Sequence, residues 1–281
     1  MSFKSILSTI LVFAFSVSAA AEIRETNFMA DAFADATPGD VIVLDIDNTI
    51  LEPAQTLGSD QWFGYLLSKF KKSGLDENAA IDKAIREWTQ VQEVTSVRLV
   101  ERTTPALIRD LQENKIMVIA LTARPVDLKR ATARQLHSAG INFQDRNVVY
   151  TNNKDIELFQ GILFVGPKNN KGTVLQHYLQ TRKIHPKRLI FVDDKEKHVK
   201  NMDAVFTPTG LTNINFRYSA ADARVKAFNA ALVDVQWEYF QKLGGVLITD
   251  EEAERIAVDR RQHLSEFMPL PIHPSHFRTA H

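Results

Sequence analysis

Short runs that are apolar at every position constrain the fold of this chain more than any other feature. A strand buried on both faces reads as such a run, which is typical of the centre of a parallel sheet. The runs lie at residues 41–44, 116–121, 148–150, 189–192 and 214–216. Segments of helical periodicity alternate with them, at residues 106–114, 126–139, 172–182 and 195–202. This alternation predicts an α/β fold, in which helices cover both faces of a Rossmann-like, doubly wound parallel sheet.

The connection between the first two runs, residues 53–103, is too long for an ordinary loop. Apolar residues recur in it at helical spacing, in two groups on either side of Ser73-Gly74: Trp62, Leu66 and Phe70, then Ile81, Ile85 and Trp88. We predict a small helical cap at residues 53–103, inserted after the first strand and packed beside the mouth of the sheet.

Two further elements are predicted outside this alternation. Residues 156–165 are expected to form a hairpin that turns at Gln160-Gly161. The apolar stripe from Val225 to Leu243 predicts one long amphipathic helix packed on the core. With residues 22–39 as a polar lead-in, the predicted division is a core domain at 22–52 and 104–260 and a flexible tail at 261–281.

The first residues have the pattern of a cleaved secretory signal, predicted at residues 1–21. Lys4 precedes an apolar run at residues 6–17 that is too short to span a bilayer, and small residues at 18–21 lead to Glu22. An uncleaved anchor and a buried helix are the alternatives. A cleaved signal predicts a periplasmic or secreted bacterial protein with no membrane segment after cleavage.

The composition excludes several classes of function. Lys and Arg together number 34, as do Asp and Glu, so no charge excess points to nucleic acid or to an anionic membrane surface. The chain has no cysteine, which excludes disulfides, thiolate metal sites and cysteine nucleophiles.

Polar residues follow the predicted strands at the points where ligands bind in open α/β sheets, which are the carboxyl ends. Asp45 and Asp47 follow the first strand directly. Two carboxylates held close together repel each other, so such a site needs a cation or a shared proton. A hard divalent metal supplies that cation and also binds phosphate oxygens.

Three other motifs fall at the same predicted edge. The second strand ends in Thr122-Ala123-Arg124, whose hydroxyl and backbone N–H groups can hold an anionic oxygen. Lys171 opens a helix, and both its charge and the helix N-terminus favour phosphate. Asp193 and Asp194 follow the strand at 189–192. Each motif alone is commonly a turn, a cap or a surface residue, but their occurrence in this order predicts one site for metal and phosphate.

Together these motifs resemble those of haloacid dehalogenase (HAD) superfamily phosphatases over residues 40–216. The shared pattern is Asp-x-Asp-x-Thr after an apolar strand, then a strand ending in Thr, then a Lys, then a strand ending in Asp-Asp. Within that superfamily the chain is similar to a group of exported bacterial proteins known as a domain of unknown function, the DUF2608 type. The resemblance implies a HAD-like core with the cap placed over the site.

The resemblance also implies roles for the motif residues. Asp45 would be the nucleophile that forms an aspartyl-phosphate, and Asp47 the acid and base. Thr122, Ala123 and Lys171 would bind the phosphoryl group, although Lys168 lies close enough to be the alternative lysine. Mg²⁺ would be held by three groups of ligands: Asp45, the backbone carbonyl of Asp47, and Asp193 or Asp194.

The predicted function is therefore an Mg²⁺-dependent phosphomonoester hydrolase acting on a phosphorylated small molecule. An acid at position 47 favours phosphate-ester chemistry, because a dehalogenase needs no proton donor there. Candidates for substrate contact in the cap are Trp62, Phe63, Trp88 and Arg98, although packing is the more usual role of the two tryptophans. A secreted, non-catalytic HAD-like binding protein and a phosphotransferase are the alternative functions.

Overall fold

The computed structural model describes residues 22–143, 149–150 and 156–267. The predicted signal at residues 1–21 lies outside the described residues, as do residues 268–281 of the predicted tail. No helix in the described part of the chain is long and apolar enough to cross a membrane.

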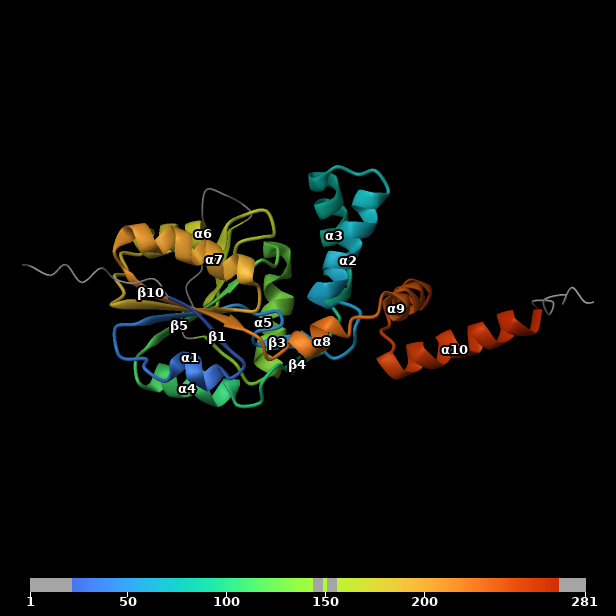
Figure 1. Cartoon of the computed structure of the whole chain (residues 1–281), viewed down its shortest axis with the longest axis horizontal. Coiled ribbons are helices and arrows are strands. Elements are labelled where there is room, and N and C mark those ends of the chain that lie inside the picture. The colour runs from blue at the N-terminus through green and yellow to red at the C-terminus, as the bar shows by residue number, and fades with distance from the viewer. Residues whose placement is uncertain (1–21, 144–148, 151–155, 268–281) are drawn as a thin grey trace, which may run out of the picture.

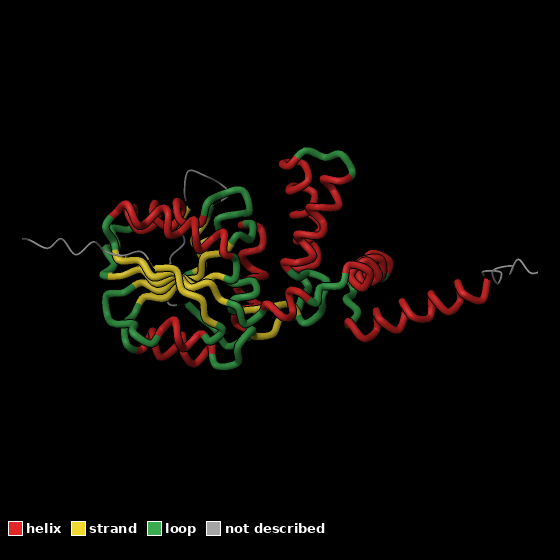
Figure 2. Tube along the Cα trace, in the orientation of Figure 1, coloured by secondary structure: helices red, strands yellow, loops and turns green. Residues whose placement is uncertain are grey.

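A central sheet of eight strands runs through the core, in the order β1-β10-β9-β2-β5-β8-β7-β6. The parallel strands are β1 (Glu22–Thr26), β10 (Thr212–Tyr218), β9 (Arg188–Asp193), β2 (Val41–Leu44), β5 (Met117–Thr122) and β8 (Ile162–Phe164). The antiparallel ones are β7 (Glu157–Phe159) and β6 (Val149–Tyr150). The mostly parallel sheet between helices confirms the predicted α/β fold class (Figure 2).

Helices cover both faces of this sheet (Figure 1). One face carries α1 (Met29–Phe33), α4 (Thr104–Glu113) and α5 (Lys129–Ser138), which follows the 3₁₀ turn η1 (Val126–Leu128). The other carries α6 (Lys171–Thr181) and α7 (Glu196–Phe206), which ends in the turn η2 (Thr207–Thr209).

Strand β2 is apolar throughout because it packs against both layers. Ile42 and Leu44 point into the core cluster under α1 and α4, and Val41 and Val43 into the cluster under α6 and α7. All four residues are buried. The period-2 alternation of side chains thus demands an apolar residue at every position of a central strand.

The predicted hairpin is present as β7 and β8, and its turn explains why glycine stands at its second position. Gln160 and Gly161 both have positive φ, at 51° and 74°, as a tight two-residue turn requires. A Cβ at Gly161 would also lie 2.3 Å from Cβ of Phe143, so the close packing there excludes any side chain.

Two predictions about the sheet are wrong. Residues 22–39, expected as a polar lead-in, contain β1 and α1, so the strand before the cap is the second in the chain. The run at residues 148–150 is not a parallel strand, because β6 pairs antiparallel with β7 at the sheet edge. Strand β8 pairs with β5 instead.

The insertion after β2 begins and ends in a two-stranded ribbon, β3 (Leu51–Pro53) paired with β4 (Val97–Leu99). Between these strands stand α2 (Asp60–Lys72) and α3 (Glu77–Gln92). Ser59 caps α2 by accepting a hydrogen bond from the backbone N–H of Trp62, and Asp76 caps α3 in the same way. These two helices pack on each other beside the sheet (Figure 1).

The predicted long helix at residues 225–243 is two helices, α8 (Asp222–Lys226) and α9 (Ala230–Lys242). The helix breaks because Asn229 adopts an extended backbone and its side chain caps α9. Helix α9 packs on the cap rather than on the sheet, and Val233 and Phe240 join Trp62 in one apolar cluster. Helix α10 (Asp250–Phe267) packs on α9 and continues past the predicted boundary at residue 260, so the predicted tail is helical up to Phe267.

Candidate active site

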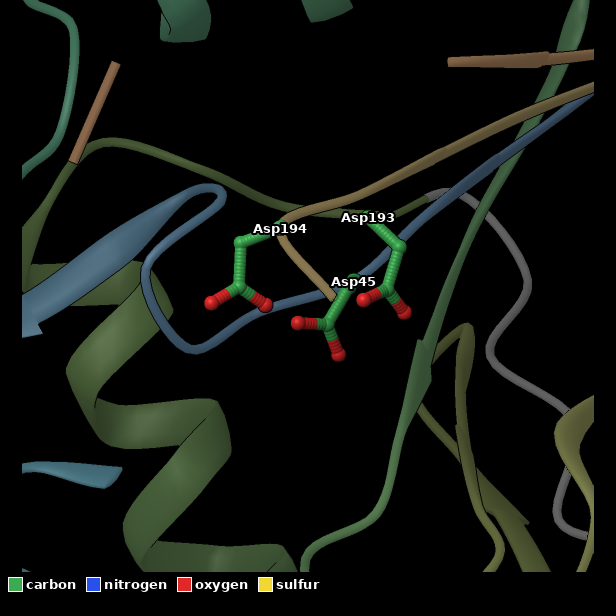
Figure 3. Close-up of side chains that lie close together, drawn as sticks. All are labelled: Asp45, Asp193 and Asp194. Atoms are coloured by element: carbon green, nitrogen blue, oxygen red, sulfur yellow. The ribbon is translucent and has the colours of Figure 1, made fainter. Parts of the chain in front are cut away.

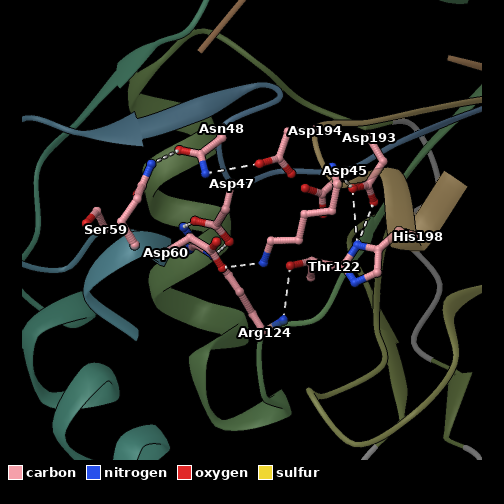
Figure 4. A network of polar contacts seen from close by, with 12 residues as sticks. Asp45, Asp47, Asn48, Ser59, Asp60, Thr122, Arg124, Asp193, Asp194 and His198 are labelled. Atoms are coloured by element: carbon pink, nitrogen blue, oxygen red, sulfur yellow. Dashed lines mark hydrogen bonds and ion pairs between the residues drawn. The ribbon is translucent and has the colours of Figure 1, made fainter. Parts of the chain in front are cut away.

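Four distant segments of the chain meet at the carboxyl edge of the sheet. Asp45 follows β2, Thr122 ends β5, Asp193 ends β9 and Lys171 begins α6. Strand β2 pairs with β5 on one side and β9 on the other, so the residues at their ends lie side by side (Figure 4). The order of the strands therefore assembles the predicted site.

Three carboxylates form a group that could hold a metal ion. Asp45, Asp193 and Asp194 each offer an oxygen, and these atoms all lie within 4.8 Å of one another (Figure 3). Oδ1 of Asp194 is buried and has no hydrogen-bond partner among the described residues. Carboxylate oxygens suit a hard divalent cation, so the residues present fit the metal that the sequence predicted.

The buried ammonium of Lys171 contacts two members of this acid group. Its Nζ donates hydrogen bonds to Oδ1 of Asp45 and, at 2.7 Å, to Oδ2 of Asp193. Burial alone would lower the pKa of Lys171, but Asp193 and Asp45 override that effect and raise it. Lys168 instead pairs with Asp82 of α3 at 2.6 Å on the surface, so the lysine among the acids is Lys171.

The carboxylates carry more negative charge than Lys171 balances. Burial raises the pKa of Asp45 to about 6, with Asp193 and Asp47 adding to the effect and Lys171 opposing it. Burial, Asp193 and Asp45 also raise the pKa of Asp194 well above its usual range. For Asp193, burial acts in the same direction, but Lys171 and His198 override it and lower the pKa. A bound divalent metal ion would neutralise this excess negative charge.

The side chain of Asp47 points away from the acid group, to Arg124. The guanidinium donates from Nε to Oδ2 at 2.9 Å and from Nη2 to Oδ1 at 2.8 Å. Burial would raise the pKa of Asp47, but Arg124 holds it below its usual value. The carboxylate of Asp47 is therefore not one of the clustered acids, and metal binding by its backbone carbonyl stays a prediction.

Arg124 is itself fixed by the core and the cap. Its Nη1 donates to Gln135 at 2.6 Å and to Thr132 at 3.1 Å, both on α5. The guanidinium also lies 5.5 Å from the ring centroid of Trp88 on α3. Since Arg124 is only 2% exposed, it holds Asp47 in one orientation.

Several residues of the site were given no individual role from the sequence. His198 has its Nδ1 3.0 Å from Oδ2 of Asp193. Asn48, at φ 59°, donates from Nδ2 to Oδ2 of Asp194 at 3.2 Å, and Thr49 accepts a hydrogen bond from the backbone N–H of Asp194. Asn48 and Thr49 lie within the first acidic motif, and Arg124 lies two residues after Thr122, so proximity to a motif was the available signal. His198 offered no such signal, because its contact depends on the start of α7.

A pocket of about 150 Å³ opens between the cap and the core. Phe63 and Trp88 line it, together with Ala123 and Asp47. The other two predicted contact residues lie elsewhere. Trp62 packs against Trp237 with ring centroids 5.3 Å apart, and Arg98 pairs with Glu52 at 2.8 Å beside a separate cavity of about 290 Å³.

The two remaining phosphate-binding candidates lie at the end of β5. Thr122 is fully buried, and its hydroxyl accepts a hydrogen bond from the backbone N–H of Arg124 at 3.1 Å. Ala123 lies in the wall of the pocket. Their binding of phosphate stays a prediction.

The topology and the convergence of the four motifs define a HAD-like α/β protein. Residues 22–254 match the family model described as a protein of unknown function, DUF2608. The chain therefore belongs to the DUF2608 family, as the resemblance predicted.

Curated relatives and solved structures are more distant. A Chlamydia trachomatis protein, provisionally named an outer membrane protein, is 26% identical over 203 residues, which span 72% of this chain and 77% of that protein. An uncharacterised Rickettsia prowazekii protein is 24% identical over 230 residues, 77% of this chain and 82% of the relative. The structure of a predicted phosphatase from Clostridium acetobutylicum matches at 12% identity and a TM-score of 0.40, covering 68% of this chain and 98% of the other. That likeness is too distant to carry a functional argument.

Proposed function

We propose that this chain is an Mg²⁺-dependent phosphomonoester hydrolase that forms an aspartyl-phosphate on Asp45. One observation carries the proposal: the buried Lys171 ammonium bridges Asp45 and Asp193 inside an acid group that has an excess of negative charge. A fixed ammonium beside a metal-binding acid group can stabilise a phosphoryl group during transfer. The proposed nucleophile, Asp45, accepts a hydrogen bond from this ammonium.

In the first step, an Asp45 carboxylate oxygen attacks phosphorus, and the bond from phosphorus to the ester oxygen breaks. The departing oxygen takes a proton from Asp47 and leaves as the alcohol. Lys171, the Thr122 hydroxyl and the Ala123 backbone N–H would bind the phosphoryl oxygens. Support for this step is the burial of Lys171 and Thr122 at the edge from which Asp45 extends.

In the second step, a water oxygen attacks phosphorus and the bond from phosphorus to Asp45 breaks. Asp47 takes the proton of that water, so phosphate leaves and the Asp45 carboxylate is restored. Asp47 enters the first step protonated and leaves it ionised. The two hydrogen bonds from Arg124 stabilise that ionised form, which then accepts the proton of the water.

The metal would be bound by the carboxylates of Asp45, Asp193 and Asp194, with the backbone carbonyl of Asp47 as a further ligand. Mg²⁺ is the metal we propose, because hard oxygen ligands in phosphoryl-transfer sites suit it. When bound, it neutralises charge on the phosphoryl oxygens. The fit of three clustered oxygens and the unpartnered Asp194 Oδ1 supports this assignment.

We also propose that the protein is exported. The pattern of residues 1–21 and the provisional outer membrane name of the Chlamydia relative support export. Mass spectrometry of the protein from periplasm and medium tests this, and an intact N-terminus in the cytoplasm alone would contradict it.

The test of function is hydrolysis of p-nitrophenyl phosphate by the purified chain. We expect turnover with Mg²⁺, loss with EDTA, and recovery when Mg²⁺ returns. Asp45→Asn should lower kcat by at least about 1,000-fold with an unchanged circular dichroism spectrum, because it removes the nucleophile. Asp82→Asn is the matched control, since Asp82 is a surface acid on α3 paired with Lys168.

The other outcomes separate the alternative functions. A folded, active Asp45→Asn protein would refute the nucleophile. No turnover across a panel of phosphate esters would favour a non-catalytic binding protein. Product that forms only when an acceptor alcohol is added would favour a phosphotransferase.

A further inference from the structure

The walls of the 150 Å³ pocket beside Asp47 are rich in apolar side chains, from both the cap and the core. Phe63 belongs to α2, while Ile85 and Trp88 belong to α3. Pro125 and Pro167 complete the apolar wall from loops of the core. Apolar side chains from the cap and the core therefore form one part of the wall, beside Asp47.

The position of this pocket gives it a place in the proposed reaction. Its wall includes Asp47 and Ala123, which would contact the departing oxygen and the phosphoryl group. Among the described residues, Asp45 and Lys171 are not in that wall. If the proposed function holds, the pocket receives the leaving group of the substrate.

We propose that the substrate is a phosphomonoester whose leaving group carries a planar aromatic ring about the size of a phenyl group. A cavity of about 150 Å³ is large enough for a ring of benzene size. This inference rests on the proposed function, which determines where the phosphate would bind. The size and lining of the pocket are the basis for an aromatic leaving group.

The two aromatic walls stand at an angle that suits a third ring. The centroids of Phe63 and Trp88 are 6.0 Å apart, and their planes make an angle of 74°. A ring that enters this corner can contact the edge of one and the face of the other, which is a favoured arrangement. Trp88 is held rigidly, because its Nε1 donates to the carbonyl of Ser59 at 3.1 Å.

The polar groups of the wall are already engaged by other protein groups. Lys195 donates to Asp60 at 2.7 Å, Arg124 pairs with Asp47, and His198 contacts Asp193. The hydroxyls of a sugar or polyol that face the rings and prolines would lose their hydrogen bonds to water without a replacement, which is costly. The same walls favour an aromatic ring, which gains by leaving water.

The test compares benzyl phosphate with glycerol 3-phosphate, since both leaving groups are primary alcohols. We expect the full chain with Mg²⁺ to show a kcat/KM about tenfold or more higher for benzyl phosphate. Phe63→Ala should lower kcat/KM for benzyl phosphate about tenfold, because it removes one aromatic contact, and lower kcat/KM for glycerol 3-phosphate much less. Ile85→Ala is a second variant with the same expected direction, should Phe63→Ala fail to fold.

Tyr65→Ala is the matched control, because Tyr65 is an aromatic residue of α2 that contacts Phe228 and Asp234 rather than the pocket. It should leave both substrates unaffected. Equal kcat/KM values for the two esters, or an equal decrease of both in Phe63→Ala, would overturn the proposal of an aromatic leaving group but not the proposed function. No turnover of either ester would overturn the proposed function and this inference with it.

Discussion

The two ends of strand β2 carry buried aspartates in opposite electrostatic surroundings. Asp40 precedes the strand and is 1% exposed, and Asp45 follows it and is 5% exposed. Asp40 accepts hydrogen bonds from Arg188 at 2.7 and 3.2 Å and from the backbone N–H of Thr37 at 2.8 Å. Asp45 is instead crowded by Asp193 and Asp47 and has Lys171 as its cation.

Their pKa values diverge for this reason. At Asp40, burial acts to raise the pKa, but Arg188 and Thr37 hold it below its usual value. At Asp45, burial together with neighbouring carboxylates raises the pKa to about 6. A buried carboxylate with enough donors stabilises a fold, whereas one among like charges needs an added cation, and such unbalanced groups are typical of functional sites.

The largest expected effect that tests this contrast is on stability. Asp40→Asn should lower the free energy of unfolding by about 2–3 kcal/mol, because it breaks a buried, charge-assisted pair. Asp45→Asn should leave the metal-free protein as stable as the parent or more so, since it relieves like-charge repulsion. Urea unfolding in EDTA measures both free energies. A larger loss of stability for Asp45→Asn than for Asp40→Asn would contradict the view that Asp40 stabilises the fold and Asp45 does not.

A divalent cation should stabilise the folded protein through the acids at the Asp45 end of β2, and not through Asp40. Mg²⁺ at a hundredfold excess over its Kd should raise the free energy of unfolding by about 2.7 kcal/mol, because it binds the folded chain alone. Asp194→Asn should reduce this gain, whereas Asp40→Asn should keep it in full. Thermal unfolding with and without Mg²⁺ is the measurement, and an equal gain in Asp194→Asn would argue against Asp194 as a ligand.

The smallest effect is the pH dependence, where the two aspartates act with opposite sign. The folded pKa of Asp40 is lowered, so its contribution is present above the unfolded value of 3.8 and is lost as pH falls through the folded value. The folded pKa of Asp45 is raised to about 6, so metal-free stability should fall as pH rises from 3.8 to about 6. One such group contributes at most about 1.4 kcal/mol per pH unit.

Asp45→Asn should make this decline between pH 4 and 6 shallower, and Asp40→Asn should leave it unchanged. Chemical unfolding in EDTA at several pH values gives the slopes. Identical slopes for the parent and Asp45→Asn would remove Asp45 as the source of the decline.

Much of the fold was predictable from local patterns. The apolar runs at β2, β5 and β9 identified central strands, because a strand with helices on both faces needs apolar residues at every position. Because these strands run parallel, their carboxyl ends lie at one edge of the sheet. The motif residues could therefore be assigned to a common site from the order of strands and motifs along the chain.

Other features depended on contacts between distant segments. The polar strand β1 exists because it pairs with β10 at the sheet edge, and no periodicity of its own reveals that partner. The break at Asn229 turns α9 onto the cap, against Trp62. A stripe of apolar residues predicts a helix but does not say which surface will cover it.

The sequence by itself determined the type of most elements and the edge where Asp45, Thr122, Lys171 and Asp193 gather, because both follow from local periodicity and strand topology. Only the tertiary structure decided which charges meet: Lys171 rather than Lys168 lies among the acids, and Arg124 pairs with Asp47. Side-chain pairing depends on the packing of segments far apart in the chain, and local sequence does not encode that packing.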